Sequence, residues 1–343
     1  MIAETIALNE KGDVTLTAYI QPVEGEFRGI FERPAVLVLP GGGYMFCSDR
    51  EADPVAFPYL KAGYDVFILR YSVGPDHAWP QPLEDYEKAM ELIENRAEEW
   101  HVCKEKIAVI GFSAGGHLAG VAATMAQRRP AAAILGYAVL NDQAKELGED
   151  LPNISGHVDE HTCPCFVFAT RTDGVVKIQN SLDFLNALNR YSISFETHIY
   201  SYGGHGFSTG DHCVQSKSSL ITERAYNWVE DSIGWLHEIF GEFGDQGMLP
   251  PVVKGHVNDD GEAWLSLDCT IGRVYGNPEA RRVLADLFEE MEEKIPPFNP
   301  GMTFDDMMHT LSAYKLRELL CERNIGTDRF DEYDQRLHKV PNI

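Results

Sequence analysis

The sequence predicts an α/β protein with a mainly parallel sheet covered by helices on both faces, followed by a small C-terminal helical region. Three observations support this prediction. Short apolar runs recur through the first 240 residues, helix-like stretches separate them, and the alternation breaks near residue 241. Parallel strands that are buried on both faces are continuous apolar runs, and strands that alternate with helices form such sheets.

The predicted strands are of two kinds. Residues 14–20 place apolar side chains at every second position, which is typical of a half-exposed strand. A strand-like stretch also occurs at 195–199, just before a glycine-rich loop. The remaining runs are continuously apolar, as expected for buried strands, and lie at 35–39, 66–69, 107–110, 132–135 and 165–168.

Helical stretches are expected between these strands, at 83–99, 114–128, 177–190 and 217–240. In open parallel sheets, ligands bind beyond the carboxyl ends of the strands. We therefore expect the functional residues just after the apolar runs.

The predicted domains are an α/β domain at 1–245, a linker at 246–261 and a helical appendage of open role at 262–343. The linker prediction rests on the glycines of 241–247 and on Leu249-Pro-Pro251. Within the appendage, Asn277-Pro278 and Thr303 with Asp306 are helix start signals. Helical apolar stripes follow at 280–291 and 316–320, and a last short helix is expected around 330–337.

The composition limits the classes of partner. A formal net charge of -24 argues against nucleic-acid or anionic-membrane partners, because both require basic patches. The N-terminal residues show no signal-peptide pattern, and no apolar run reaches the length of a membrane span, so we expect a cytoplasmic protein. Seven cysteines without framework spacing are expected to be reduced thiols.

The strongest chemical signal is Gly111-Phe-Ser113-Ala-Gly115, between a predicted buried strand and a helix. Such a turn exposes the serine oxygen and needs small neighbours, and the helix N-terminus favours developing negative charge. Ser113 is the candidate nucleophile, and an inert serine in a tight turn is the alternative.

Three consecutive glycines follow another strand, in Pro40-Gly-Gly-Gly-Tyr44. Backbone N–H groups of Gly42 and Gly43, completed by that of Ala114, could form an oxyanion hole for acyl transfer. A flexible loop and a phosphate-binding loop are the alternatives, although the segment lacks the G-K-[ST] ending of a phosphate-binding loop.

A nucleophilic serine needs a base and an acid that orients the base, in the chain order serine, acid, histidine for this arrangement. Asp173 follows the strand ending near Phe168, and Asp142 is its rival. His205 stands between glycines in an expected loop, and His212 is its rival, whereas His198 and His117 fit structural roles better. The predicted chemistry requires no metal or organic cofactor, and no zinc spacing occurs.

These motifs resemble the acetyl xylan esterase-like branch of the α/β-hydrolases. The resemblance covers roughly residues 14–240 and rests on Leu39–Tyr44, Ser48–Glu51, Tyr64–Tyr71 and Gly111–Ala119. It implies a three-layer α/β/α sandwich and hydrolysis of small acyl esters, often acetyl groups on plant-polysaccharide fragments. By position, Ser113, Asp173 and His205 match the nucleophile, acid and base of that family.

The sequence departs from the family at Pro40, where lipase-like relatives carry a histidine, and at Lys177, where a proline is usual. The short stretch between Leu140 and Cys163 leaves little room for a lipase lid, which favours small soluble substrates. Tyr44, Phe46 and Phe207 are candidates for the substrate pocket.

The expected partner is therefore a small ester, with an acetylated carbohydrate implied by the resemblance alone and a homodimer left open. An amidase, peptidase or kynurenine formamidase-like hydrolase could use the same triad, because the pocket sets the substrate. A catalytically idle hydrolase fold that acts as a binding protein is the alternative from another class.

Overall fold

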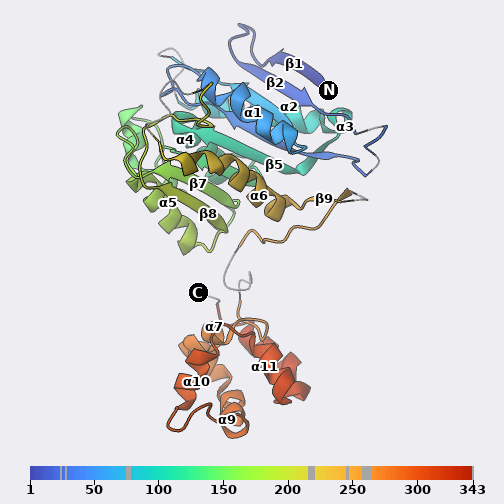
Figure 1. The fold of residues 1–343 in the computed structure, drawn as a ribbon, viewed down its shortest axis with the longest axis vertical. Helices are drawn as coiled ribbons and strands as arrows, with labels where there is room; N and C mark the ends of the chain where they lie inside the picture. The colour runs from blue at the N-terminus through green and yellow to red at the C-terminus, as the bar shows by residue number, and fades with distance from the viewer. Residues whose placement is uncertain are drawn as a thin grey trace. The chain divides into compact units, whose positions relative to one another are not determined.

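The computed structural model describes residues 1–23, 25–27, 29–74, 79–214, 221–244, 247–256 and 264–341. The chain divides into two compact units, Met1–Gly255 and His256–Ile343 (Figure 1). Each unit has its own hydrophobic core. Among the described residues, no helix has both the length and the apolar character needed to cross a membrane.

Unit 1 is built around an eight-stranded sheet with the order β1-β2-β4-β3-β5-β6-β7-β8. The β1–β2 and β2–β4 pairs are antiparallel, and all other neighbours are parallel. The strands are β1 (Ile2–Ala7), β2 (Thr15–Ile20), β3 (Arg33–Leu39), β4 (Asp65–Arg70), β5 (Val102–Phe112), β6 (Ala132–Gly136), β7 (Cys165–Thr170) and β8 (Phe195–Tyr200).

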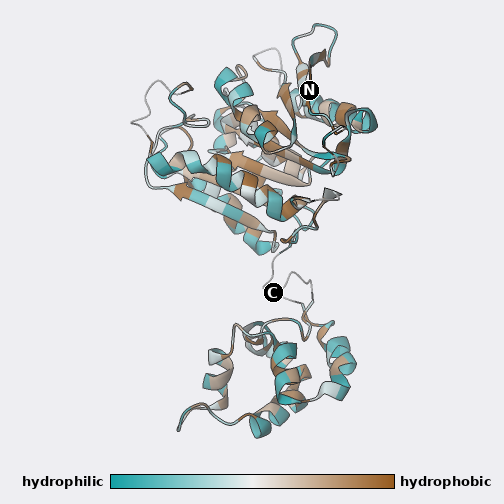
Figure 2. Cartoon of the chain, turned by 45° about the vertical axis from the view of Figure 1, so that its right-hand side comes forward, coloured by the Kyte–Doolittle hydropathy of each residue, from teal (hydrophilic) through white to brown (hydrophobic). Residues whose placement is uncertain are grey.

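Helices cover both faces of this sheet, which confirms the three-layer α/β/α prediction (Figure 1). One face packs against α2 (Gln81–Asn95), α3 (Ala97–Trp100), α4 (Ser113–Thr124) and α5 (Gln179–Arg190). The other face packs against α1 (Asp53–Lys61) and α6 (Trp228–Phe240). Figure 2 shows hydrophobic residues along the central strands, and the helices carry hydrophobic and hydrophilic residues in alternation.

The predicted strands all occur, but β1 and α1 were not predicted. β1 is a largely exposed edge strand without an apolar run, and α1 contains Pro54 and Pro58, which hide the helical pattern. The helix expected at 83–99 is interrupted at Arg96, between α2 and α3. The helix expected at 217–240 has a 3₁₀ turn at Glu223–Asn227 before α6, and its first residues lie outside the described ranges.

The predicted linker at 246–261 lies only partly within the described residues. Its β10 (Gly247–Met248) pairs with β9 (Phe243–Gly244), and the Val252 and Val253 N–H groups donate to the carbonyl oxygen of Glu238. Residues 247–256 are therefore divided between the units at Gly255, with most of them in unit 1.

Unit 2 is helical. The Asn277 side chain accepts hydrogen bonds from the Glu279 and Ala280 N–H groups, and Thr303 and Asp306 form a reciprocal capping box, as their sequence signals predicted. The helices are α7 (Ile271–Gly276), α8 (Pro278–Val283), α9 (Ala285–Lys294), α10 (Phe304–Thr310), α11 (Leu316–Arg323) and α12 (Phe330–Leu337).

Candidate active site

Ser113 lies on a sharp turn between β5 and α4, in a left-handed backbone conformation with a φ of 54°. The neighbouring glycines permit this turn. A Cβ on Gly111 would lie 2.2 Å from the carbonyl oxygen of Gly115, and one on Gly115 would lie 2.2 Å from that of Leu39. Any larger residue would collide with backbone, so the turn requires the small residues from which it was predicted.

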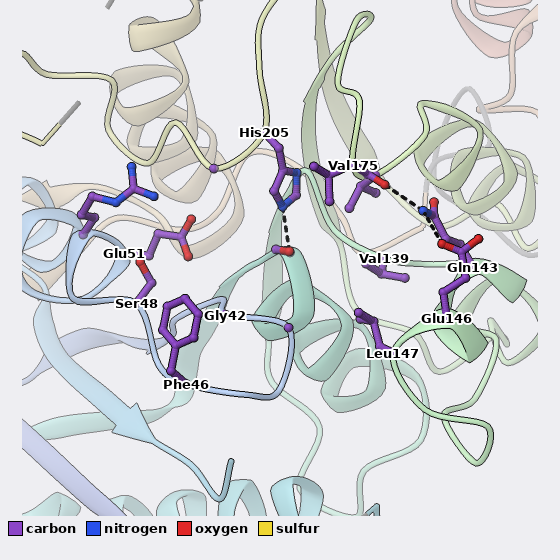
Figure 3. Close-up of a pocket in the computed structure, with 15 residues that line it drawn as sticks. Gly42, Phe46, Ser48, Glu51, Val139, Gln143, Glu146, Leu147, Val175 and His205 are labelled. Carbon is purple, nitrogen blue, oxygen red and sulfur yellow. Dashed lines mark hydrogen bonds between the residues drawn. The ribbon is translucent and has the colours of Figure 1, made fainter. Parts of the chain in front are cut away.

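The side chains of Ser113, His205 and Asp173 form a continuous hydrogen-bonded chain. The Nε2 atom of His205 lies 2.8 Å from Ser113 Oγ (Figure 3), and its Nδ1 atom lies 2.7 Å from Asp173 Oδ2. The carboxylate accepts, so Nδ1 carries the proton and Nε2 is free to accept the serine proton. This arrangement can activate the serine as a nucleophile.

The Asp173 carboxylate is held rigidly by its own loop. Its Oδ1 accepts hydrogen bonds from the N–H groups of Val175 and Val176, at 2.8 and 3.0 Å, and the side chain is 2% exposed. The N–H of Lys177 donates to Gln143 Oε1 at 3.2 Å, a contact that the proline usual at this position could not make.

The rival residues lie elsewhere. Asp142 is exposed and pairs with Lys145, and His212 is exposed. His198 lies in β8 and pairs with Glu196 and Asp231. None of these residues lines the cavity at Ser113.

His117 is buried beneath the site, as the sequence suggested. Its Nε2 lies 2.9 Å from the carbonyl oxygen of Pro152, and its Nδ1 lies 2.8 Å from Tyr44 Oη. Burial lowers the pKa of His117 to about 4, so the ring is neutral near pH 7 and serves as a packed structural group.

The glycine-rich loop lies beside Ser113. A Cβ on Gly41 would be 3.1 Å from that of Ser113, and Gly42 and Gly43 have φ values of 135° and 63°. Within the described residues, the N–H groups of Gly42 and Gly43 donate no hydrogen bond. Together with Ala114, at the N-terminal end of α4, they are available for an oxyanion.

A cavity of about 300 Å³ opens over Ser113 and His205 (Figure 3). Phe46, one of the pocket candidates, lines it. Its other lining residues come from the glycine-rich loop, the 3₁₀ turn after it, and the loops that follow β6, β7 and β8: Gly42, Gly43, Ser48, Arg50, Glu51, Val139, Gln143, Glu146, Leu147, Val175, Val176 and Gly206.

Tyr44 and Phe207, the other two pocket candidates, do not line this cavity. Tyr44 turns toward the core, where its hydroxyl meets His117. Phe207 is 1% exposed and packs on Tyr137 with ring centroids 4.9 Å apart. Both rings pack in the apolar layers of unit 1. Closeness to a motif in the sequence does not show in which direction a side chain points.

Sequence reasoning missed Glu51, a buried carboxylate in the cavity wall that is 3% exposed. It also missed the hydrophobic lining by Val139, Leu147 and Val175. The only available signal for Glu51 was its place in Ser48–Glu51, one of the stretches that carried the family resemblance. In the described residues, His, Cys, Asp and Glu side chains form no group of three or more suited to a metal ion.

Comparison with protein families finds that residues 29–148 match the BD-FAE family model. Two curated proteins are similar to about half of the chain. One is endo-1,4-beta-xylanase B of Butyrivibrio fibrisolvens, 30% identical over 211 residues, and the other is acetylxylan esterase of Xylanibacter ruminicola, 28% identical over 200 residues. The matches cover 52% and 51% of this chain but only 33% and 41% of those proteins.

Solved structures match a large part of this chain over their own nearly complete length. MGS-M1, an α/β hydrolase enzyme from a Medee basin deep-sea metagenome library, is 40% identical, with a TM-score of 0.65 and coverage of 70% of this chain and 98% of that one. An acetyl ester-xyloside bifunctional hydrolase from Caldicellulosiruptor lactoaceticus is 25% identical, with a TM-score of 0.60 and coverage of 69% and 96%. The carboxylesterase Cest-2923 from Lactobacillus plantarum is 27% identical, with a TM-score of 0.63 and coverage of 69% and 98%.

Proposed function

This chain belongs to the α/β-hydrolase family, in which it is related to acetylxylan esterases and carboxylesterases, and from that premise we propose that it is a serine esterase for short acyl esters. The observation that carries the proposal is the hydrogen-bonded chain from Ser113 through His205 to Asp173. It lies beside a glycine-rich loop whose Gly42 and Gly43 N–H groups are unpaired within the described part of the chain.

In the proposed mechanism, His205 Nε2 takes the Ser113 hydroxyl proton as Oγ attacks the ester carbonyl carbon. The N–H groups of Gly42, Gly43 and Ala114 stabilise the resulting oxyanion. The imidazolium then gives its proton to the alcohol oxygen as the ester C–O bond breaks. Water, deprotonated by the same histidine, releases the acid from the acyl-serine, and Asp173 stabilises the imidazolium in both steps.

We propose acetylated sugars or xylo-oligosaccharides as the substrates. A cavity of about 300 Å³ suits a small acyl group with part of a sugar ring better than a long lipid chain. Two proteins similar to this chain are named as an acetylxylan esterase and an acetyl ester-xyloside bifunctional hydrolase, which supports this choice. A cytoplasmic location and a homodimer remain predictions from the sequence.

Acetate release from acetylated xylo-oligosaccharides tests the proposal, with wild type measured beside Ser113→Ala. Removal of the nucleophile should lower kcat by about a million-fold, the order of loss that the same change causes in subtilisin, a serine hydrolase with the same triad. Ser155→Ala is the matched control, because Ser155 lies outside the cavity and its hydroxyl only donates to the Leu140 carbonyl oxygen. It should keep its acetate release.

A folded wild-type protein that cleaves neither these substrates nor aryl acetates, and that takes up no fluorophosphonate on Ser113, would refute the esterase proposal. Cleavage of aryl acetates without cleavage of the sugar esters would refute only the carbohydrate substrate.

A further inference from the structure

Glu51 is a buried carboxylate that the proposed proton transfers do not use. It ends a 3₁₀ turn at Asp49–Glu51, directly after the glycine-rich loop, and is 3% exposed. Its side chain lies in the cavity wall beside Ser48 (Figure 3). A buried carboxylate costs free energy unless its oxygens are satisfied, so its contacts indicate what it does.

Both carboxylate oxygens accept hydrogen bonds from groups of the active site. The N–H of Gly41 donates to Oε2 at 2.8 Å, and the hydroxyl of Tyr137 donates to Oε1 at 2.7 Å. Burial raises the pKa of Glu51, while these two hydrogen bonds and the positive charges of Arg50 and of a protonated His205 act in the opposite direction. Both oxygens of the Glu51 carboxylate are thus held by hydrogen bonds, and its charge lies close enough to interact with a protonated His205.

Tyr137 extends this connection to the loop that carries His205. Its hydroxyl accepts a hydrogen bond from the N–H of Ser208 at 3.0 Å. Its ring packs edge-on against the His205 ring, with centroids 5.1 Å apart. The path Gly41–Glu51–Tyr137–Ser208 therefore joins the glycine-rich loop to the histidine loop, although these segments are far apart in the sequence.

We propose that Glu51 is a positioning residue that holds the glycine-rich loop in register with Ser113 and His205. The Gly41 N–H is the anchored one, whereas the N–H groups of Gly42 and Gly43, two residues of the cavity wall, have no acceptor within the described residues. The carbonyl oxygens of Gly41 and Gly42 accept hydrogen bonds from N–H groups within residues 45–48, and the Glu51 carboxylate adds the contact that ties this loop to Tyr137 and the histidine loop. This inference rests on the proposed esterase function for its kinetic consequence, but not for its structural one.

Three variants separate positioning from bulk stability. Glu51→Gln keeps the volume, but its amide oxygen can accept only one of the two hydrogen bonds, and Glu51→Ala accepts neither. Asp65→Asn is the matched control, because Asp65 is also buried and accepts a backbone N–H, that of Gln21 at 2.7 Å, but lies at the start of β4 outside the cavity.

Kinetics on an acetate ester give the first readout. We expect kcat to fall about 10-fold in Glu51→Gln and about 100-fold in Glu51→Ala, with KM within about threefold, because small displacements of the reacting groups cost this much. Asp65→Asn should keep its kcat. A raised KM at unchanged kcat would overturn the proposal, since Glu51 would then contact the substrate, and so would equal losses in all three variants.

Amide hydrogen exchange of residues 38–47 gives a second readout that does not depend on activity. Exchange in this segment should be at least about tenfold faster in Glu51→Ala than in wild type, and unchanged in Asp65→Asn, because the Gly41 N–H loses its acceptor. If wild type proves inactive, the esterase proposal fails and the exchange data still decide the positioning role. Unchanged exchange of residues 38–47 in Glu51→Ala would refute the positioning role.

Discussion

Replacement of His117 by glutamine should remove a large part of the acid sensitivity of unit 1. His117 is fully buried between Tyr44, the carbonyl of Pro152 and the ring of Trp79. A carbonyl can only accept, so Nε2 carries the proton and Nδ1 accepts from the Tyr44 hydroxyl. A protonated ring would be a donor at both nitrogens. The Tyr44 hydroxyl would then have to accept from Nδ1, and its own proton would need another acceptor in a buried site.

The magnitude follows from the pKa of His117, which burial lowers from 6.5 to about 4. The unfolded chain therefore binds a proton before the folded chain does. The contribution of the neutral His117 ring to the unfolding free energy is fully present above the pKa of the histidine in the unfolded chain. It is lost as the pH falls from about 7 to about 4, where the loss reaches about 3 kcal/mol. Glutamine offers an acceptor and a donor but does not titrate. Over this pH range, the unfolding free energy of His117→Gln should therefore fall by about 3 kcal/mol less than that of wild type.

Urea unfolding followed by tryptophan fluorescence is the appropriate assay, because four of the five tryptophans lie in unit 1. The useful quantity is the difference in unfolding free energy between wild type and His117→Gln at each pH, since other groups that titrate cancel in it. Burial raises the pKa of Asp65 to about 7, which gives wild type an opposing slope that both proteins share. A difference that stays constant from pH 7 to pH 4 would refute the buried neutral histidine.

Two further predictions concern the acid and the elbow helix. Asp173→Asn should lower kcat about 10⁴-fold with the fold intact, because the amide favours the wrong histidine tautomer. Asp142→Asn should stay within about twofold of wild type in the same steady-state assay. Comparable losses of kcat in the two variants would show that Asp173 is not the acid. Gly116→Ala should destabilise unit 1 by about 1–3 kcal/mol in urea, since its Cβ would lie 2.4 Å from the Cβ of Ala138, which cannot move without its backbone. Gly120→Ala should destabilise unit 1 less, because its Cβ would meet side-chain atoms of Ile154 and Leu140, which can shift. Equal stability of the two alanine variants would contradict this interpretation of the packing.

The sequence was sufficient to predict the parallel sheet and the three triad candidates, because both depend on local patterns. The apolar runs at 35–39, 66–69, 107–110, 132–135 and 165–168 all lie in buried strands, and the glycines around Ser113 and His205 mark loops at strand ends. The hydrogen bonds among Ser113, His205 and Asp173 then follow from the rule that the carboxyl ends of parallel strands share one edge of the sheet.

The wall of the cavity could not be predicted in this way. Tyr44 and Phe46 are two residues apart on one loop, yet one ring enters the core and the other faces the cavity, since Tyr44 has a φ of 59° and a buried partner in His117. Glu51 is acidic, and acidic residues are ordinarily exposed. Its burial depends on Tyr137 and on the Gly41 N–H, and neither contact leaves a periodic signal in the sequence.

Ser113 and His205, the proposed nucleophile and base, follow strands that differ in local stability. Ser113 follows β5, which has neighbours on both sides, whereas His205 follows β8, which stands at the end of the strand order and pairs with β7. Edge strands open at lower free-energy cost than central ones. Partial opening at this edge would separate the base from an otherwise intact nucleophile, so the protein would lose turnover reversibly before it lost its core. For the proposed esterase, we therefore expect the temperature range for activity to follow the cohesion of β8 and not that of the whole sheet.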